Sequence, residues 1–170
     1  MVFALYGNYS LVAQEVLDKN NNASLKDFLT SKPYIKEGLL KRLEPTIQKL
    51  VEKGNIRHTF AQSVLIDYID CQEDPEKLDY LADLVKETLP ALLASRDGLR
   101  VACALFNRLD AKDRKIVIKS LPVGDMILNR IAHLFIIHIV NNLDDTQLTK
   151  KKILNEAILK IDDSLDDTSY

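Results

Sequence analysis

Basic side chains are the groups in this sequence whose type and spacing could do chemistry. Four of them fall close together in one stretch of helical spacing: Lys112, Arg114, Lys115 and Lys119. Such cations could contact the phosphates of a polyanion, and each contact would make binding more sensitive to salt. They could also form an ordinary solvated helix face. The same two interpretations apply to the lysines at 150–152, so the sequence predicts candidate phosphate contacts without deciding between them.

No catalytic or metal-binding constellation accompanies these cations. The chain has three histidines and two cysteines, and none of them has a ligand spacing such as HExxH or CxxC. No glycine-rich phosphate loop is present. The acidic pair Asp144-Asp145 falls at an expected helix start, where the helix dipole stabilises carboxylates without any catalytic role. The sequence therefore predicts a protein that is not an enzyme, with no cofactor, no metal and no small-molecule substrate.

The composition limits where a cationic surface can lie. A chain of 170 residues is long enough for one domain with a continuous core, and 46% hydrophobic residues is ordinary for a folded protein. The net charge is -2, so a surface that binds polyanions must be a local patch. The longest apolar run, 131–140, is about half a membrane span and is interrupted by His133 and His138. We therefore expect no membrane association.

Helices must position these side chains, because apolar residues recur at spacings of three and four along most of the chain. No stretch shows the alternation and hairpin turns of β-strands. Pro45 removes a backbone donor, so two helices or one kinked helix are expected around it. We predict one helical domain over residues 1–160 and an acidic, frayed tail over 161–170. The expected helices cover residues 7–19, 24–30, 33–53, 56–69, 75–85, 99–109, 111–121, 125–130, 131–143 and 147–160.

The expected helices form groups in which a short helix precedes a long apolar helix and then a charged one. This grouping recurs around Tyr9, His58, Arg100 and His133, at intervals of 49, 42 and 33 residues. Helical-repeat proteins have periods of about 20–50 residues, so the pattern favours a stack of repeats. Because the period is irregular, a helix bundle stays open as an alternative.

Residues 97–102, DGLRVA, together with residues 112–119, KDRKIVIK, are similar to one particular family, and weaker matches lie at 6–9, 57–68 and 132–148. On these segments the chain resembles the Puf-A family, the divergent pumilio-type repeat proteins of the nucleolus. The resemblance implies an all-α fold, an α-solenoid of about four pumilio-type three-helix repeats. It also implies a C-terminal fragment of a longer protein, since family members have more repeats than this length allows.

The function implied by the resemblance is binding of RNA, with DNA open as a second ligand, and with little preference for sequence. The family takes part in making the large ribosomal subunit, so the implied location is the nucleus and nucleolus, with translational regulation as a further possibility. Pre-ribosomal proteins stay open as partners. The alternative is a protein-binding helical-repeat scaffold, which would suit the net charge of -2 and the acidic tail.

In sequence-reading pumilio proteins, each repeat reads one base with two or three side chains. Carried over to this chain, these side chains form four triplets: Asn8, Tyr9 and Val12; Arg57, His58 and Ala61; Leu99, Arg100 and Cys103; Ala132, His133 and Ile136. The last member of each triplet cannot hydrogen-bond a base edge, or does so weakly as a thiol. The middle members have planar groups that can lie on a base. The resemblance therefore implies contacts to the backbone and to base faces, without a base code.

The predicted nucleic-acid-binding residues are the cations and histidines of these segments: Arg57, His58, Arg96, Arg100, Lys112, Arg114, Lys115 and His133. Each also has a structural interpretation. Arg100 could pair with Asp97 or Asp113, and the two histidines of this set could be core or capping residues. The third histidine, His138, does not repeat the stacking position and is predicted to be structural.

Overall fold

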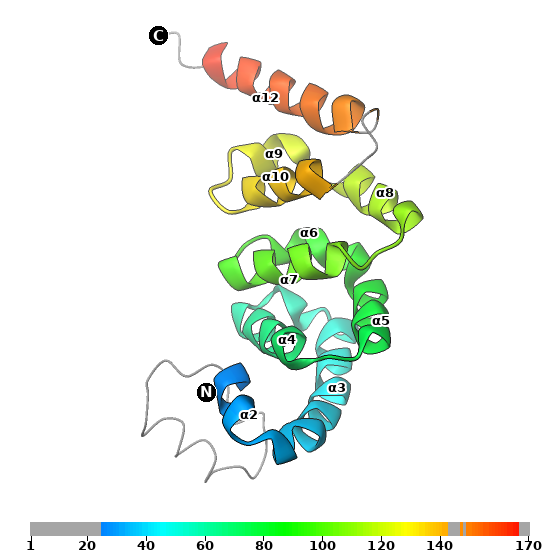
Figure 1. Cartoon of the computed structure of the whole chain (residues 1–170). Helices are drawn as coiled ribbons and strands as arrows, with labels where there is room; N and C mark the ends of the chain where they lie inside the picture. The colour runs from blue at the N-terminus through cyan, green and yellow to red at the C-terminus, as the bar shows by residue number, and fades with distance from the viewer. Residues whose placement is uncertain (1–24, 143–146, 148, 167–170) are drawn as a thin grey trace. The chain divides into compact units, whose positions relative to one another are not determined.

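The computed structural model describes residues 25–142, 147 and 149–166. Within these ranges every regular element is helical (Figure 1), which confirms the all-α prediction. None of the helices in this part of the chain is long and apolar enough to cross a membrane. The predicted helix 7–19 and the triplet that begins at Asn8 lie outside the described residues. The chain divides into two compact units, Met1–Leu78 and Asp79–Tyr170.

The first unit is organised around two long helices and the turn that joins them. Leu39, Leu43 and Ile47 are buried along one face of α3, at the spacing of four that a helix requires. Pro45 lies inside this helix, which continues for 17 residues, so a single helix forms where one or two were expected. The elements are α2 (Leu25–Ser31), η2 (Pro33–Ile35), α3 (Lys36–Glu52), η3 (Asn55–Arg57), α4 (Thr59–Cys71) and the start of α5 (Pro75–Val85).

The turn between α3 and α4 contains two features that determine where α4 begins. Gly54 has a φ of 67°, in the left-handed region that glycine adopts without steric cost. Gln62 is fully buried, and its Nε2 donates to the carbonyl of Ile56 at 3.2 Å and to that of Arg57 at 3.4 Å. The side chain of Gln62 therefore stabilises the turn from inside the unit.

The second unit contains two stacked pairs of helices, α6 with α7 and α9 with α10, and α7 also packs against α10 (Figure 1). Phe106 and Phe135 are both fully buried, and their rings meet edge to face with centroids 5.6 Å apart. The last helix ends at Asp166, beyond the expected end at Lys160. The elements after α5 are η4 (Lys86–Thr88), α6 (Leu89–Leu92), α7 (Arg96–Phe106), α8 (Ala111–Ser120), α9 (Val123–Ile127), α10 (Ala132–Asn142), the π-helix η5 (Thr149–Leu154) and α12 (Asn155–Asp166).

Three successive groups show the same order of a long helix, a short helical turn and a second long helix: α3–η3–α4, α5–α6–α7 and α8–α9–α10. We call α4, α7 and α10 the second helices. A cap residue precedes each of them, and its carbonyl accepts from the N–H four positions later: His58 from Gln62, Ser95 from Leu99, and Asn129 from His133. α4 and α7 begin directly after their caps, whereas a turn of two residues separates Asn129 from the start of α10. The cap residues are 37 and 34 residues apart, which is more regular than the predicted intervals.

Candidate nucleic-acid interface

The cap residues place the second helices in a common register. The sixth and seventh residues after each cap are buried in all three helices: Val64 and Leu65, Val101 and Ala102, Phe135 and Ile136. The register derived from hydrogen bonds thus agrees with the burial pattern. The residues four, five and eight positions after the cap are equivalent, and they are Gln62, Ser63 and Ile66; Leu99, Arg100 and Cys103; His133, Leu134 and Ile137.

The predicted equivalence of the base-reading triplets is therefore wrong in two repeats. The triplet that begins at Arg57 starts five residues too early, because His58 has the extended conformation of a cap and is not part of α4. The triplet that begins at Ala132 starts one residue too early. The middle, stacking position is filled by Ser63, Arg100 and Leu134, so neither His58 nor His133 lies there. Whether these two histidines bind nucleic acid stays a prediction.

The corrected positions offer few groups for base-edge recognition. In the first unit, the amide of Gln62 is buried and bonded to the turn. In the second unit, burial raises the pKa of the Cys103 thiol to about 11, so the sulfur stays a weakly polar, protonated group at neutral pH. His133 Nδ1 lies 2.9 Å from the carbonyl of Asn129, to which it donates. This bond leaves Nε2 of His133 as the ring atom that could accept from a base.

One narrow stripe on each second helix of the second unit faces solvent. Residues one, five, eight and twelve positions after the cap lie on the same side of an α-helix. From α7 and the residue that follows it they are Arg96, Arg100, Cys103 and Asn107, and from the turn before α10 and α10 itself they are Arg130, Leu134, Ile137 and Asn141. All are exposed except Cys103, which is half-buried. We call these eight residues the exposed stripe.

Arg130 is a candidate that sequence reasoning missed. It has the position of Arg96, the first residue after the cap, and it is exposed in the same way. The matching order of a polar cap and an arginine, Ser95-Arg96 and Asn129-Arg130, was a signal that could have revealed it. The backbone N–H of Gly98 donates to Ser95 Oγ at 2.9 Å, and that of Ala132 donates to Asn129 Oδ1 at 3.0 Å, so the two side chains cap their helices alike.

The predicted cations of α8 separate into two sets. Lys112, Lys115 and Lys119 are exposed at spacings of three and four, and we call them the α8 lysines. Arg114 instead points toward α7. Its guanidinium lies 5.8 Å from the centre of the Phe106 ring, an Nη donates to the carbonyl of Asn107 at 2.6 Å, and Nε is buried without a hydrogen-bond partner. This geometry favours the structural interpretation for Arg114.

Two further predictions concern side chains near α7 and α10. His138 Nε2 donates to Asn107 Oδ1 at 2.9 Å, and the His138 ring stacks on Phe135 with centroids 6.3 Å apart. The structural role predicted for His138 is thus confirmed. Asp113, proposed as a partner of Arg100, forms an ion pair with Lys86 at 2.7 Å.

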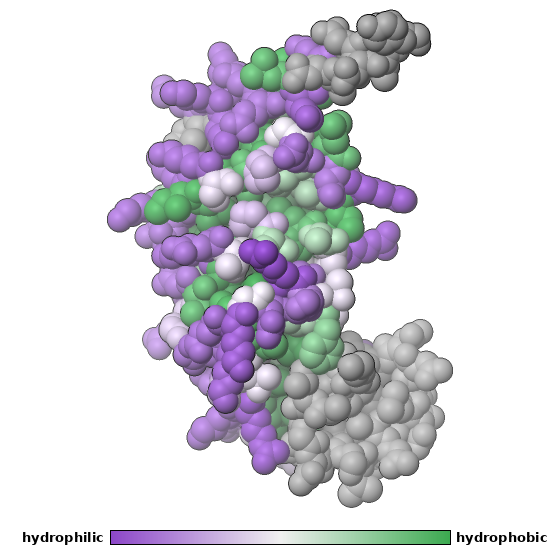
Figure 2. Space-filling model, turned by 180° about the vertical axis from the view of Figure 1, so that it is seen from behind, coloured by the Kyte–Doolittle hydropathy of each residue, from purple (hydrophilic) through white to green (hydrophobic). Residues whose placement is uncertain are grey.

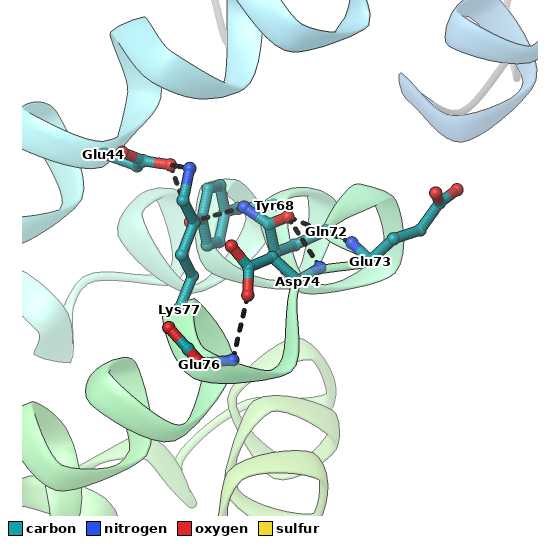
Figure 3. A network of polar contacts seen from close by, with 7 residues as sticks. All are labelled: Glu44, Tyr68, Gln72, Glu73, Asp74, Glu76 and Lys77. Atoms are coloured by element: carbon teal, nitrogen blue, oxygen red, sulfur yellow. Dashed lines mark hydrogen bonds and ion pairs between the residues drawn. The ribbon is translucent and has the colours of Figure 1, made fainter.

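The first unit brings together a different set of charges. Arg57 and His58 are exposed at the turn before α4, whereas the other six predicted residues belong to the second unit. A network joins α3 to the start of α5 (Figure 3): Lys77 Nζ donates to Glu44 Oε1 at 2.6 Å, and Gln72 Nε2 donates to the Tyr68 hydroxyl at 2.9 Å.

An open cleft of about 530 Å³ lies beside this network. Its charged lining is mixed, with three lysines and four carboxylates: Lys36, Lys41, Lys77, Glu37, Glu44, Glu73 and Asp74. The mixture gives the cleft no cationic character that would attract a polyanion. Among the described residues, no group of three or more His, Cys, Asp or Glu side chains could hold a metal ion.

Comparisons of the sequence and of the fold with known proteins both find pumilio-type repeat proteins. No family model matches the chain. Pumilio homology domain family member 6 of Schizosaccharomyces pombe is 28% identical over 141 residues, which are 82% of this chain and 22% of that protein. Pumilio domain-containing protein 12 of Caenorhabditis elegans is 25% identical over 158 residues, which are 92% of this chain and 20% of that protein. The chain therefore spans about a fifth of the length of these relatives.

Among solved structures, human Puf-A in complex with DNA has a TM-score of 0.77 to this chain at 23% sequence identity. The match covers 94% of this chain and 31% of the Puf-A chain. Human Puf-A without DNA matches with a TM-score of 0.75. The α-solenoid of pumilio-type repeats is thereby confirmed as the fold. In sequence the chain is similar to pumilio-domain proteins, and in fold it is similar to human Puf-A.

Proposed function

We propose that this chain binds nucleic acid, primarily RNA, through its phosphate backbone and with little sequence preference. The exposed stripe is the observation that supports this function most directly. At the four positions where a sequence-reading pumilio protein needs hydrogen-bonding side chains, α7 and α10 have Leu99, Cys103, His133 and Ile137, and of these only His133 offers a strong hydrogen-bonding group. Arginines accompany them at Arg96, Arg100 and Arg130, and arginine is well suited to phosphate recognition. Affinity without a base code follows from this combination.

The α8 lysines would add a second cationic surface. Lys112, Lys115 and Lys119 lie on one side of a ten-residue helix, and each could neutralise one phosphate. Arg57 and His58 of the first unit remain predicted contacts that this proposal includes. Support from the relatives is of a general kind, because their names describe pumilio domains and one solved structure of human Puf-A contains DNA. A role in nucleolar assembly of the large ribosomal subunit is proposed from the family resemblance.

A panel of unrelated RNA sequences of equal length, with DNA counterparts, tests this function. We expect similar affinities across the panel, and a linear fall of log K with log salt concentration. Substitution of the three α8 lysines by alanine should weaken binding to every sequence alike and flatten the salt dependence. Substitution of Arg108, which pairs with Asp79 at 3.1 Å, is the control and should have a smaller effect. A strong preference for one motif, or affinity that does not change with salt, would contradict the proposal.

A protein-binding scaffold is the second candidate, and one observation favours it. Leu134 and Ile137 are 45% and 51% exposed on α10, although both are large and apolar. Exposed apolar groups of this kind are frequent at protein interfaces. Figure 2 shows hydrophobic surface between hydrophilic side chains on the face that it presents. If this candidate is right, the purified chain will bind no RNA or DNA at low salt.

A further inference from the structure

We propose that the segment formed by η5 and α12 pairs with the same segment of a second copy of this chain, in antiparallel orientation, so that two copies form a symmetric dimer. The residues involved are separate from those of α7, α8 and α10 that serve the proposed function, and the inference does not rest on that function. An exposed apolar row on the segment and the order of charges along it support the pairing.

The segment is buried on one side and apolar but exposed on another. α12 packs against α9 (Figure 1), and Ala157 and the preceding Ile153 are buried. Leu154, Ile158 and Ile161 are instead 47%, 55% and 44% exposed. Their spacings of four and three place them on one side of the helix, and we call them the apolar row. Single exposed apolar side chains are ordinary on protein surfaces, whereas a contiguous group of them marks an interaction surface.

Charges are distributed unevenly along the segment. Lysines fill residues 150–152 near its beginning, whereas residues 162–166 near its end, DDSLD, include three aspartates. A helix dipole favours the opposite order, with carboxylates near the N-terminus and cations near the C-terminus. The observed order therefore does not stabilise the helix that contains it. In an antiparallel pair it would be complementary, because the lysine end of each copy would lie beside the aspartate end of the other.

Two exposed charges border the apolar row. Lys150 precedes Leu154 by four residues, and Asp162 follows Ile158 by four, so each lies on the side of the helix that the row occupies. The next lysine but one, at residue 152, instead pairs with Glu156 at 2.6 Å within the chain. Lys150 and Asp162 are therefore the charges that we expect to meet across the dimer.

A twofold axis midway along the row would bring these groups together. Leu154 of one copy would pack near Ile161 of the other, and the Ile158 side chains of both copies would lie near the axis. Lys150 of each copy would then lie within about one helical turn of Asp162 in the other. A parallel pair would place like charges side by side, so the charges favour the antiparallel arrangement.

The size of the surface sets the strength that we expect. η5 has 6 residues and α12 has 12, which together form about 25 Å of helix. Two helices of this length bury less area than the roughly 1,200–2,000 Å² of a stable interface. The dimer should therefore be weak and become populated at high micromolar concentration.

Sedimentation velocity of the full chain without nucleic acid, over a series of protein concentrations, tests the pairing. We expect the average mass to rise from that of one chain toward that of two, and the dimer to weaken as salt screens the exposed charges. Ile158→Asp should weaken dimerisation by about tenfold or more, because it places a carboxylate in the apolar contact. The matched control is Leu159→Asp, at a residue that is 65% exposed but lies off the apolar row, and it should dimerise like wild type.

Charge reversal tests the antiparallel orientation. Lys150→Asp and Asp162→Lys should each weaken dimerisation by a few-fold, because each creates two contacts between like charges in the symmetric dimer. An equimolar mixture of the two variants should recover the association of wild type, since both contacts then join opposite charges. Circular dichroism of each variant verifies that it folds.

Three results would overturn the dimer or its orientation. A chain that stays monomeric at every concentration would show that a second copy does not cover the apolar row, and would make another protein the better candidate. Equal effects of Ile158→Asp and Leu159→Asp would show that copies associate through a different surface. A mixture of the charge-reversed variants that associates no better than either variant alone would exclude the antiparallel pairing.

Discussion

The second helices α7 and α10 have the same place in successive repeats, yet they present different surfaces. Five residues after the cap, α7 has Arg100 and α10 has Leu134. Eight residues after the cap, α7 has the half-buried Cys103 and α10 has the exposed Ile137. The sixth and seventh residues are buried and apolar in both helices. The comparison shows that packing constrains one side of these helices, while the other side is free to vary in its chemistry.

The first and twelfth residues after the cap are the exceptions on the variable side. Arg96 matches Arg130 and Asn107 matches Asn141, although the residues between them along the exposed stripe differ. In α4 of the first unit the corresponding residue is Thr59. The four positions equivalent to the exposed stripe are Thr59, Ser63, the buried Ile66 and Asp70, and none of them is a cation. Among these equivalent positions, arginines therefore occur in the second unit.

The largest effect is expected where α7 and α10 meet. Phe106→Ala removes a fully buried ring that contacts Phe135 and lies beneath the Arg114 guanidinium. Loss of the ring and the cavity left behind should lower the free energy of unfolding by about 3–5 kcal/mol. Chemical denaturation measures this change.

The matched control for Phe106→Ala is Ile137→Ala, at an exposed position of similar apolar character. A surface change of this kind should stay within about 0.5 kcal/mol of wild type. Similar destabilisation by both variants would show that the exposed stripe takes part in packing, and the contrast between the two sides of the helices would not hold.

The helices themselves could be predicted from the sequence, because their apolar spacing is dictated by burial. The prediction of 111–121 agrees closely with α8 at Ala111–Ser120, and the apolar run at 131–143 is α10. The register of the candidate site could not be predicted in the same way. Arg57-His58 has the composition of a helix start, but the left-handed Gly54 and the 3₁₀ turn after it delay α4 until Thr59.

The orientation of individual cations was also beyond the sequence. Arg114 belongs to a run of basic residues and is expected to face solvent with them. It turns inward because Phe106 at the end of α7 and the carbonyl of Asn107 just after it offer a ring face and an acceptor. The turn between α7 and α8 decides this contact, and the periodicity within one helix contains no information about it.

A smaller effect is expected when the surface of α10 is made like that of α7. Leu134→Arg places a guanidinium at the position of Arg100. We expect affinity for duplex RNA to rise by a few-fold and the salt slope to steepen by about one, since one more phosphate can be neutralised.

The reverse change on α7, Arg100→Leu, serves as the counterpart and should weaken duplex binding. Fluorescence anisotropy with labelled RNA at several salt concentrations measures both variants. If Leu134→Arg leaves the salt slope unchanged, position five after the cap does not face the nucleic acid, and the exposed stripe would have to be redefined.

The smallest expected effect is a pH dependence of stability that originates in α10 and has no counterpart in α7. Nine residues after the cap, α10 has His138 and α7 has Ala104. Burial lowers the pKa of His138, and a hydrogen bond to the Cys103 backbone opposes this shift only in part. The folded state therefore binds the proton less readily than the unfolded state, so stability should be constant above about pH 6.5 and fall as the pH drops below that value.

His138→Gln keeps a donor for Asn107 but removes the titrating ring. The thermal midpoint of this variant should therefore fall less steeply at acid pH than that of wild type. A parallel decline in both proteins would assign the acid sensitivity to carboxylates such as Glu73, whose pKa is lowered by the hydrogen bond from Lys36, and not to the histidine that distinguishes α10 from α7.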